Sequence, residues 1–120
     1  MPTLEKGRDI AERLLELGAS IVLTAKRLPK DRWGRHISFQ LVRAVTGAGS
    51  NYEEARGAES RADFIHKVGI ALKELRETSY WLALVAKTNN LDLDREIDEA
   101  NQLAAILMAS KRTAIENRSR

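Results

Sequence analysis

Asp63 and His66 are the two side chains whose types and spacing most resemble a metal site. Residues three apart on a helix point to the same side, as the ligand pairs of di-metal helix bundles do. Such bundles need a second carboxylate–histidine pair, but the only other histidine, His36, has Trp33 and Phe39 at that spacing. We therefore expect Asp63 to cap a helix and His66 to lie on the surface. A metal-dependent enzyme built on this pair and nearby glutamates remains an alternative.

Other catalytic chemistry has little support in the sequence. The chain has no cysteine, which excludes disulfides, zinc–thiolate sites and thiol catalysis. The serines lie in no nucleophile-elbow context, and the sequence GAG at residues 47–49 does not follow a strand as a phosphate-binding loop would. We predict that the chain is not an enzyme and that it holds no cofactor and no metal.

Composition also bears on location. A chain without cysteine fits a reducing, cytoplasmic setting. No apolar run approaches the ~20 residues that a membrane span requires. The first residues, MPTLEKGRDIAERLLELG, mix acids and bases with apolar positions, so we expect neither a signal peptide nor a membrane partner.

Apolar residues recur every three or four positions along most of the 120 residues, which is the period of an amphipathic helix. The pattern predicts helices over about 3–28, 33–56, 60–88 and 93–116. The expected caps are Thr3, Asp31, Ser60 and either Asp92 or Asp94 at helix starts, and Asn89 with Asn90 at a helix end. Four helices with short connections predict an all-α fold, an antiparallel up-down-up-down four-helix bundle, as a single domain over residues 1–120.

Two features of these helices need an explanation. Gly47 and Gly49 lie inside the second helix, which we expect to survive them, with either another backbone close by or a bend. Helices 3 and 4 carry more apolar residues than one seam can bury. A second apolar stripe is best explained by self-association, although a wide core face would also account for it.

Basic residues gather around the first helix–helix connection. The net charge is only +3, but the bases outnumber a single acid between residues 26 and 43. Phosphate binding needs such a gathered set. The candidate nucleic-acid-binding residues are Lys26, Arg27, Lys30, Arg32, Arg35 and Arg43. The alternative is that the acids between Asp92 and Glu99 neutralise them, within a subunit or between subunits. Trp33 and Phe39 lie among the bases and could stack on a single strand, or could pack in a core or interface.

A longer stretch resembles a known family. The residues Gln40-Leu41-Val42-Arg43-Ala44, then Gly49-Ser50-Asn51-Tyr52-Glu53-Glu54-Ala55, then GAESRADFIHKVGIALKELRETSYWLALV from 57 to 85, agree in order and spacing. They resemble the core signature of the small bacterial four-helix-bundle family named for the 23S ribosomal RNA intervening sequence. LPKD, residues 28–31, stands where that family has its first turn.

The resemblance implies a left-handed bundle that assembles as a homopentamer, in a family without attached enzymatic activity and mostly of unknown function. It also implies a nucleic-acid role, because a relative is an accessory protein to the reverse transcriptase of diversity-generating retroelements and binds nucleic acid through a basic surface. Asn51, Glu54 and Gly57 would then be a structural motif at the end of helix 2, and Arg43 a partner for an acid on a neighbouring helix.

The leading hypothesis is therefore a non-enzymatic, self-assembling scaffold or accessory protein that binds RNA or DNA through a basic surface, with a reverse transcriptase as a candidate partner. The alternative is a protein–protein interaction adaptor without a nucleic-acid role, which would use the surplus apolar face of helices 3 and 4.

Overall fold

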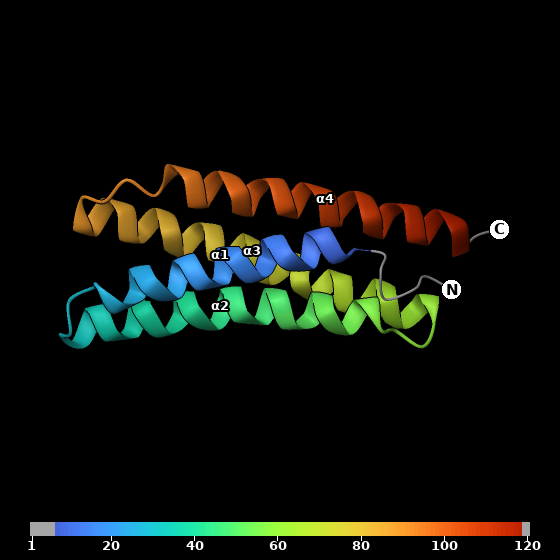
Figure 1. Cartoon of the computed structure of the whole chain (residues 1–120), viewed down its shortest axis with the longest axis horizontal. Coiled ribbons are helices and arrows are strands. Elements are labelled where there is room, and N and C mark those ends of the chain that lie inside the picture. The colour runs from blue at the N-terminus through green and yellow to red at the C-terminus, as the bar shows by residue number, and fades with distance from the viewer. Residues whose placement is uncertain (1–6, 119–120) are drawn as a thin grey trace.

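The computed structural model of the chain describes residues 7–118 and shows four helices in chain order. They are α1 (Arg8–Lys26), α2 (Arg32–Arg56), α3 (Arg61–Asn89) and α4 (Asp94–Arg118). Figure 1 shows each helix running opposite to the one before it, so that α1 begins and α4 ends at the same end of a rod. The rod measures 52 × 22 × 19 Å. The prediction of an all-α four-helix bundle is confirmed.

The core lies along the axis of the rod and follows the predicted apolar spacing. On α3, Val68, Ala71, Leu75, Thr78, Leu82 and Val85 are all buried. The hydroxyl of Thr78 donates to the carbonyl of Glu74 in its own helix at 2.8 Å, so this polar side chain is satisfied inside the core. Helices adjacent in sequence pack against each other, and α1 closes the bundle against α4 with the fewest contacts of the four helix pairs.

The helix ends explain most of the boundaries. The carboxylate of Asp31 accepts a hydrogen bond from the backbone N–H of Gly34 at 2.8 Å, and the hydroxyl of Ser60 accepts one from Asp63 at 3.0 Å. Both predicted N-caps are confirmed. Asn90 has φ 52°, the left-handed conformation expected of a helix-ending asparagine, and ends α3 as predicted.

The caps predicted at the starts of α4 and α1 have different outcomes. Before α4, the side chain of Asp92, rather than that of Asp94, accepts the backbone bond, from Asp94 N at 3.1 Å. The expected cap Thr3 lies outside the described residues. α1 ends at Lys26 rather than residue 28, because the backbone N–H of Leu28 reaches back only three residues to Ala25, and Pro29 follows.

Gly47 and Gly49 leave α2 continuous, as expected, and the atoms nearest to them belong to no other backbone. A Cβ at Gly47 would lie 2.5 Å from the carboxylate oxygen Oε2 of Glu74, whereas a Cβ at Gly49 would meet nothing within 4 Å. Gly47 therefore makes room for a side chain of α3.

The exposed apolar residues are not where the sequence placed them. Most of the surplus apolar side chains of α3 and α4 are buried or half-buried, because the bundle gives these helices a wide core face. The most exposed large apolar side chains on α1 and α2 are instead Leu15 and Leu23 (73% and 62% exposed) and Trp33 and Phe39. Tyr80 and Ile115 are exposed on α3 and α4, so exposed apolar side chains occur on all four helices and are not concentrated on helices 3 and 4 as predicted.

Candidate nucleic-acid interface

The turn between α1 and α2 forms one end of the rod and carries five exposed bases. α1 delivers Lys26 and Arg27 to this end, the turn carries Lys30, and the first turns of α2 carry Arg32 and Arg35. The ammonium of Lys30 donates to the carbonyl of Lys26 at 2.9 Å, at the partly negative end of the α1 dipole. We call these five residues the basic end.

None of the five residues of the basic end forms an ion pair with a carboxylate anywhere in residues 7–118. Other arginines of the bundle differ in this respect. Arg13 pairs with Glu99 at 2.7 Å, and Arg56 pairs with Glu53 at 2.9 Å. The basic end therefore presents positive charge that the described part of the chain does not compensate.

Arg43 lies apart from the basic end, in the seam between α2 and α3. Its guanidinium pairs with Glu74 at 3.2 Å and with Glu77, and its Nε donates to Gln40 at 3.0 Å. The expectation that Arg43 partners an acid on a neighbouring helix is confirmed. Because two carboxylates hold its charge, Arg43 does not share the free charge of the other five candidates.

The acids at the start of α4 form no ion pair with the basic end among residues 7–118. Glu99 accepts two bonds from Arg13 of α1, and Glu96 accepts one from the hydroxyl of Ser20 at 3.1 Å. Asp98 accepts from Gln102 in its own helix at 2.7 Å, and Asp92 accepts from the backbone of Asp94 at 3.1 Å. Glu96 and Glu99 therefore join α4 to α1, whereas partial neutralisation of the basic end by the other acids, within a subunit or between subunits, stays an alternative.

The outer face of α3 carries further bases that the sequence analysis missed. Lys73, Arg76, Tyr80 and Lys87 are exposed, and their spacing of three, four and seven residues places them on one side of the helix. The three bases form no described ion pair. The spacing of these bases indicates a shared helix face, but the net charge of consecutive blocks of sequence does not reveal it. We call these four residues the α3 stripe.

Aromatic side chains connect α3 to the start of α2. Trp81 meets Tyr80 edge-on with ring centroids 5.2 Å apart, and meets His36 of α2 edge-on at 6.2 Å. The indole N–H of Trp81 donates to Glu77 at 3.2 Å. Trp33 lies one turn before His36, and the guanidinium of Arg32 lies 5.0 Å from the Trp33 ring centroid. A row of rings therefore runs from the stripe to the basic end.

The residues Asn51, Glu54 and Gly57 lie at the end of α2, as predicted. The amide of Asn51 donates to the carbonyl of Gly47 at 2.9 Å, and Glu54 pairs with Lys67 of α3 at 2.6 Å, an interaction that raises the pKa of that lysine. Gly57 has φ −98°, which any residue can adopt. The contacts of Asn51 and Glu54 are structural.

The metal candidates are not brought together with further ligands. His66 is exposed near the start of α3, and Asp63 lies in the first turn as the residue that Ser60 caps. Within residues 7–118, no group of three or more His, Asp or Glu side chains is arranged to hold a metal ion. In the same range, no helix is both long enough and apolar enough to cross a membrane.

Residues 7–109 match the family model of the 23S rRNA-intervening sequence protein. The chain belongs to this family. A crystal structure of a protein of unknown function from the S23 ribosomal protein family of Bacteroides thetaiotaomicron is similar in fold, with a TM-score of 0.77 and 33% sequence identity. The likeness covers 85% of this chain and 97% of that one. No curated protein matches the chain.

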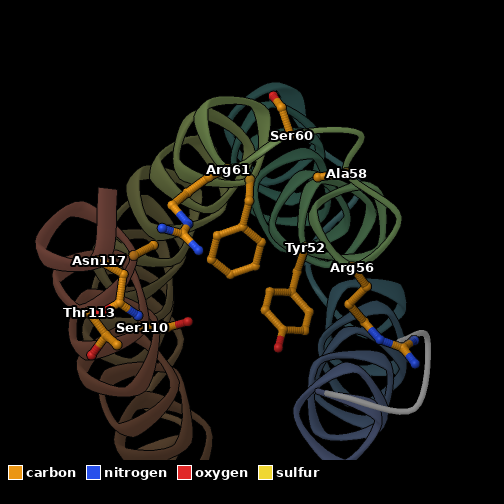
Figure 2. A pocket seen from close by; sticks show the side chains of 10 residues that line it. Tyr52, Arg56, Ala58, Ser60, Arg61, Ser110, Thr113 and Asn117 are labelled. Atoms are coloured by element: carbon orange, nitrogen blue, oxygen red, sulfur yellow. The ribbon is translucent and has the colours of Figure 1, made fainter. Parts of the chain in front are cut away.

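This intervening-sequence protein also has a cavity of about 380 Å³ at the end of the rod opposite the basic end. Figure 2 shows it between the α2–α3 turn and the last turns of α4, with the Tyr52 hydroxyl pointing into it and the Arg61 side chain beside it. Tyr52 is buried, and burial raises the pKa of its hydroxyl. Ser110, Thr113 and Asn117 of α4 line the far wall. The residues that line the cavity include Arg56 and Arg61 and no acid, so the cavity offers positive charge together with hydrogen-bonding groups.

Proposed function

We propose that this intervening-sequence protein is a non-enzymatic, self-assembling bundle that binds nucleic acid through its basic end and acts in the cytoplasm as an accessory or scaffold. The observation that carries the proposal is the contrast between paired and unpaired bases. Arg13, Arg43 and Arg56 each have a carboxylate partner, whereas the five exposed residues of the basic end have none within the described residues 7–118. Phosphate groups would supply the missing counter-charge.

Self-assembly is supported by an apolar groove between α1 and α2. Its volume is about 640 Å³, and its lining includes Leu15, Gly18, Ala19, Val22 and Gly49. Leu15 on its rim is 73% exposed and extends the apolar lining of the groove, which a partner surface would cover. We propose that the partner is a second copy of the chain, in the pentamer that the family resemblance suggests.

The same groove favours a second candidate function, a protein-binding adaptor. A reverse transcriptase is the partner that the resemblance suggests. The two uses of the groove predict different masses for the purified protein in solution. A species of five times the 13.5 kDa subunit supports self-assembly, and a single subunit that binds a purified partner through the groove supports the adaptor.

Nucleic-acid binding is tested by fluorescence anisotropy with labelled RNA and DNA at low and rising salt. Five phosphate contacts predict a slope of log K against log salt of about −4. Lys30→Glu with Arg32→Glu should abolish binding. Arg112→Glu is the matched control, because Arg112 is exposed near the other end of the rod. If the wild-type protein binds no probe at low salt, or if the control weakens binding as much as the basic-end variant, the proposal is wrong.

A further inference from the structure

The α3 stripe and the rings beside it are the strongest feature that the proposed function does not yet use. Lys73, Arg76 and Lys87 share one exposed helix face with Tyr80, which is 60% exposed. α3 ends where α2 begins, at the basic end (Figure 1). The stripe therefore extends the basic end along the side of the rod, by about 21 Å over fourteen residues of helix.

Two carboxylates of α3 that lie among the stripe residues in sequence are already compensated. Glu74 and Glu77 both accept from the guanidinium of Arg43 in α2. Glu77 also accepts from the indole of Trp81. The positive charge of the stripe is therefore not cancelled by its own helix or by α2.

The ring of Tyr80 contacts Trp81 and leaves much of its own surface open. Trp81 packs against it edge-on at an interplanar angle of 74°, while Trp81 is itself held by its bond to Glu77 and by the His36 contact. Trp33, 66% exposed, offers a second open ring next to Arg32. Rings fixed beside bases suit a flat ligand that carries negative charge.

A second copy of this chain that met this surface through the same face would be a poor occupant, because it would bring the same lysines and arginines against one another, and like charges repel. A cyclic pentamer joins different faces of its subunits, and the contact proposed for it here is the groove between α1 and α2. A nucleic-acid strand provides both negative charge and flat rings. In a duplex the faces of the bases are stacked on each other, whereas a single strand can place them on protein rings.

Resting on the proposed function, we infer that the basic end and the α3 stripe form one continuous site for single-stranded nucleic acid, in which Tyr80 and Trp33 stack on unpaired bases. Lys73, Arg76 and Lys87 contact the phosphates along α3, and the basic end contacts those that follow. The inference adds to the proposed function a class of ligand, a path along the rod and two positions that contact bases.

The experiment compares three fluorescein-labelled probes by anisotropy at low salt: dT20, rU20 and a mixed-sequence DNA duplex of 20 base pairs. The wild-type protein should bind the single strands at least about tenfold more tightly than the duplex. Tyr80→Ala and Trp33→Ala should each weaken single-strand binding about tenfold and leave duplex binding unchanged. Lys73→Glu should weaken binding to every probe.

Matched controls separate stacking from damage to the fold. Tyr80→Phe keeps the ring and should bind as the wild type does, and Ile115→Ala changes an exposed apolar side chain of α4, near the end of the rod opposite the basic end. Circular dichroism checks that each variant keeps its helices. A variant that loses helicity is replaced by Tyr80→Leu or Trp33→Leu, which keep bulk but cannot stack.

The outcomes distinguish the two claims. Equal affinity for single strand and duplex, with no effect of either ring variant, overturns the inference. If that binding still depends on Lys30 and Arg32, the proposed function stands. No binding to any probe overturns both. If labelled poly-glutamate binds as tightly as dT20 and loses the same affinity in Tyr80→Ala, the site recognises acidic chains in general, and the inference is wrong.

Discussion

Arg13 of α1 and Glu99 of α4 form a two-point ion pair, with Nε 2.9 Å from Oε2 and Nη2 2.7 Å from Oε1. Side chains of this pair are about one-third exposed. The pair crosses the seam between α1 and α4, where the helices make the fewest contacts. It therefore fixes the closure of the bundle at the place where apolar packing contributes least.

Replacing Glu99 should lower stability in a pH-dependent way. The hydrogen bond from Arg13 holds the pKa of the Glu99 carboxyl below its ordinary value of 4.5. A lowered folded-state pKa gives stability that is present above the unfolded-state pKa and is lost as pH falls through the folded-state pKa. Glu99→Gln should therefore cost about 1 kcal/mol at pH 7, a figure reduced for solvent exposure, and progressively less as the pH falls below 4.5. Urea unfolding at pH 7 and at a series of lower pH values measures this.

Asp98→Asn serves as the control for the Glu99 variant. The substitution removes the same charge at the adjacent position, where the side chain bonds within the described residues only to Gln102 of its own helix. Equal losses in the two variants at pH 7 would mean that net charge, rather than the link to Arg13, carries the effect.

Replacing Arg43 by methionine should destabilise the α2–α3 seam. Glu74 is only 15% exposed, and without Arg43 its carboxylate would be left poorly solvated. We expect a loss of about 1–2 kcal/mol in the free energy of unfolding. In a Glu74→Gln, Glu77→Gln background the same change should cost clearly less, and a double-mutant cycle measures the difference. Additive losses would show that the guanidinium and the carboxylates do not interact.

Two glycines of α2 should respond to alanine with opposite signs. A Cβ at Gly49 meets nothing within 4 Å, so Gly49→Ala should stabilise the helix by about 0.5–1 kcal/mol. A Cβ at Gly34 would lie 2.0 Å from the carbonyl oxygen of Pro29, which is backbone and cannot easily move, so Gly34→Ala should cost roughly 1–3 kcal/mol. Thermal unfolding of both variants tests the signs, and the same sign for both would contradict the packing around the first turn.

Charges on the exposed apolar surface of α1 should dissociate the assembly. Leu15→Glu places a charge on the rim of the α1–α2 groove, and Leu23→Glu places one elsewhere on α1. Both changes leave the core intact, because both side chains are exposed in one subunit. Light scattering should give a mass of five times 13.5 kDa for the wild type and a lower mass for each variant. Ile115→Glu is the control, an exposed apolar side chain on α4. An unchanged mass in all three variants would place the interface elsewhere.

Apolar spacing predicted the helices well because burial of one helix face leaves a period in the sequence, and it did so most clearly from Phe64 to Val85. Caps at Asp31, Ser60 and Asn90 were predictable for a similar reason, since each is a local bond between a side chain or a turn and the nearby backbone. Such signals depend on residues that are close together in the sequence.

Contacts between helices were less predictable. Counting charges along the chain grouped Arg43 with the basic end, whereas Glu74 and Glu77, more than thirty residues away, hold it in the seam. Blocks of sequence also hid the α3 stripe, whose members share a face but are separated by apolar and acidic residues. The sequence alone does not show how many apolar residues of α3 and α4 are buried, because the width of a buried helix face depends on how closely the neighbouring helices pack.

The start of α1 and the end of α4 lie together, while the turn that carries the basic end lies at the other tip of a 52 Å rod. A dye, affinity handle or immobilisation tether joined near Gly7 or Arg118 is thereby kept most of the molecule's length from Lys30 and Arg32. The protein can therefore be attached to a sensor chip or a single-molecule slide at either residue, with the basic end facing the solution.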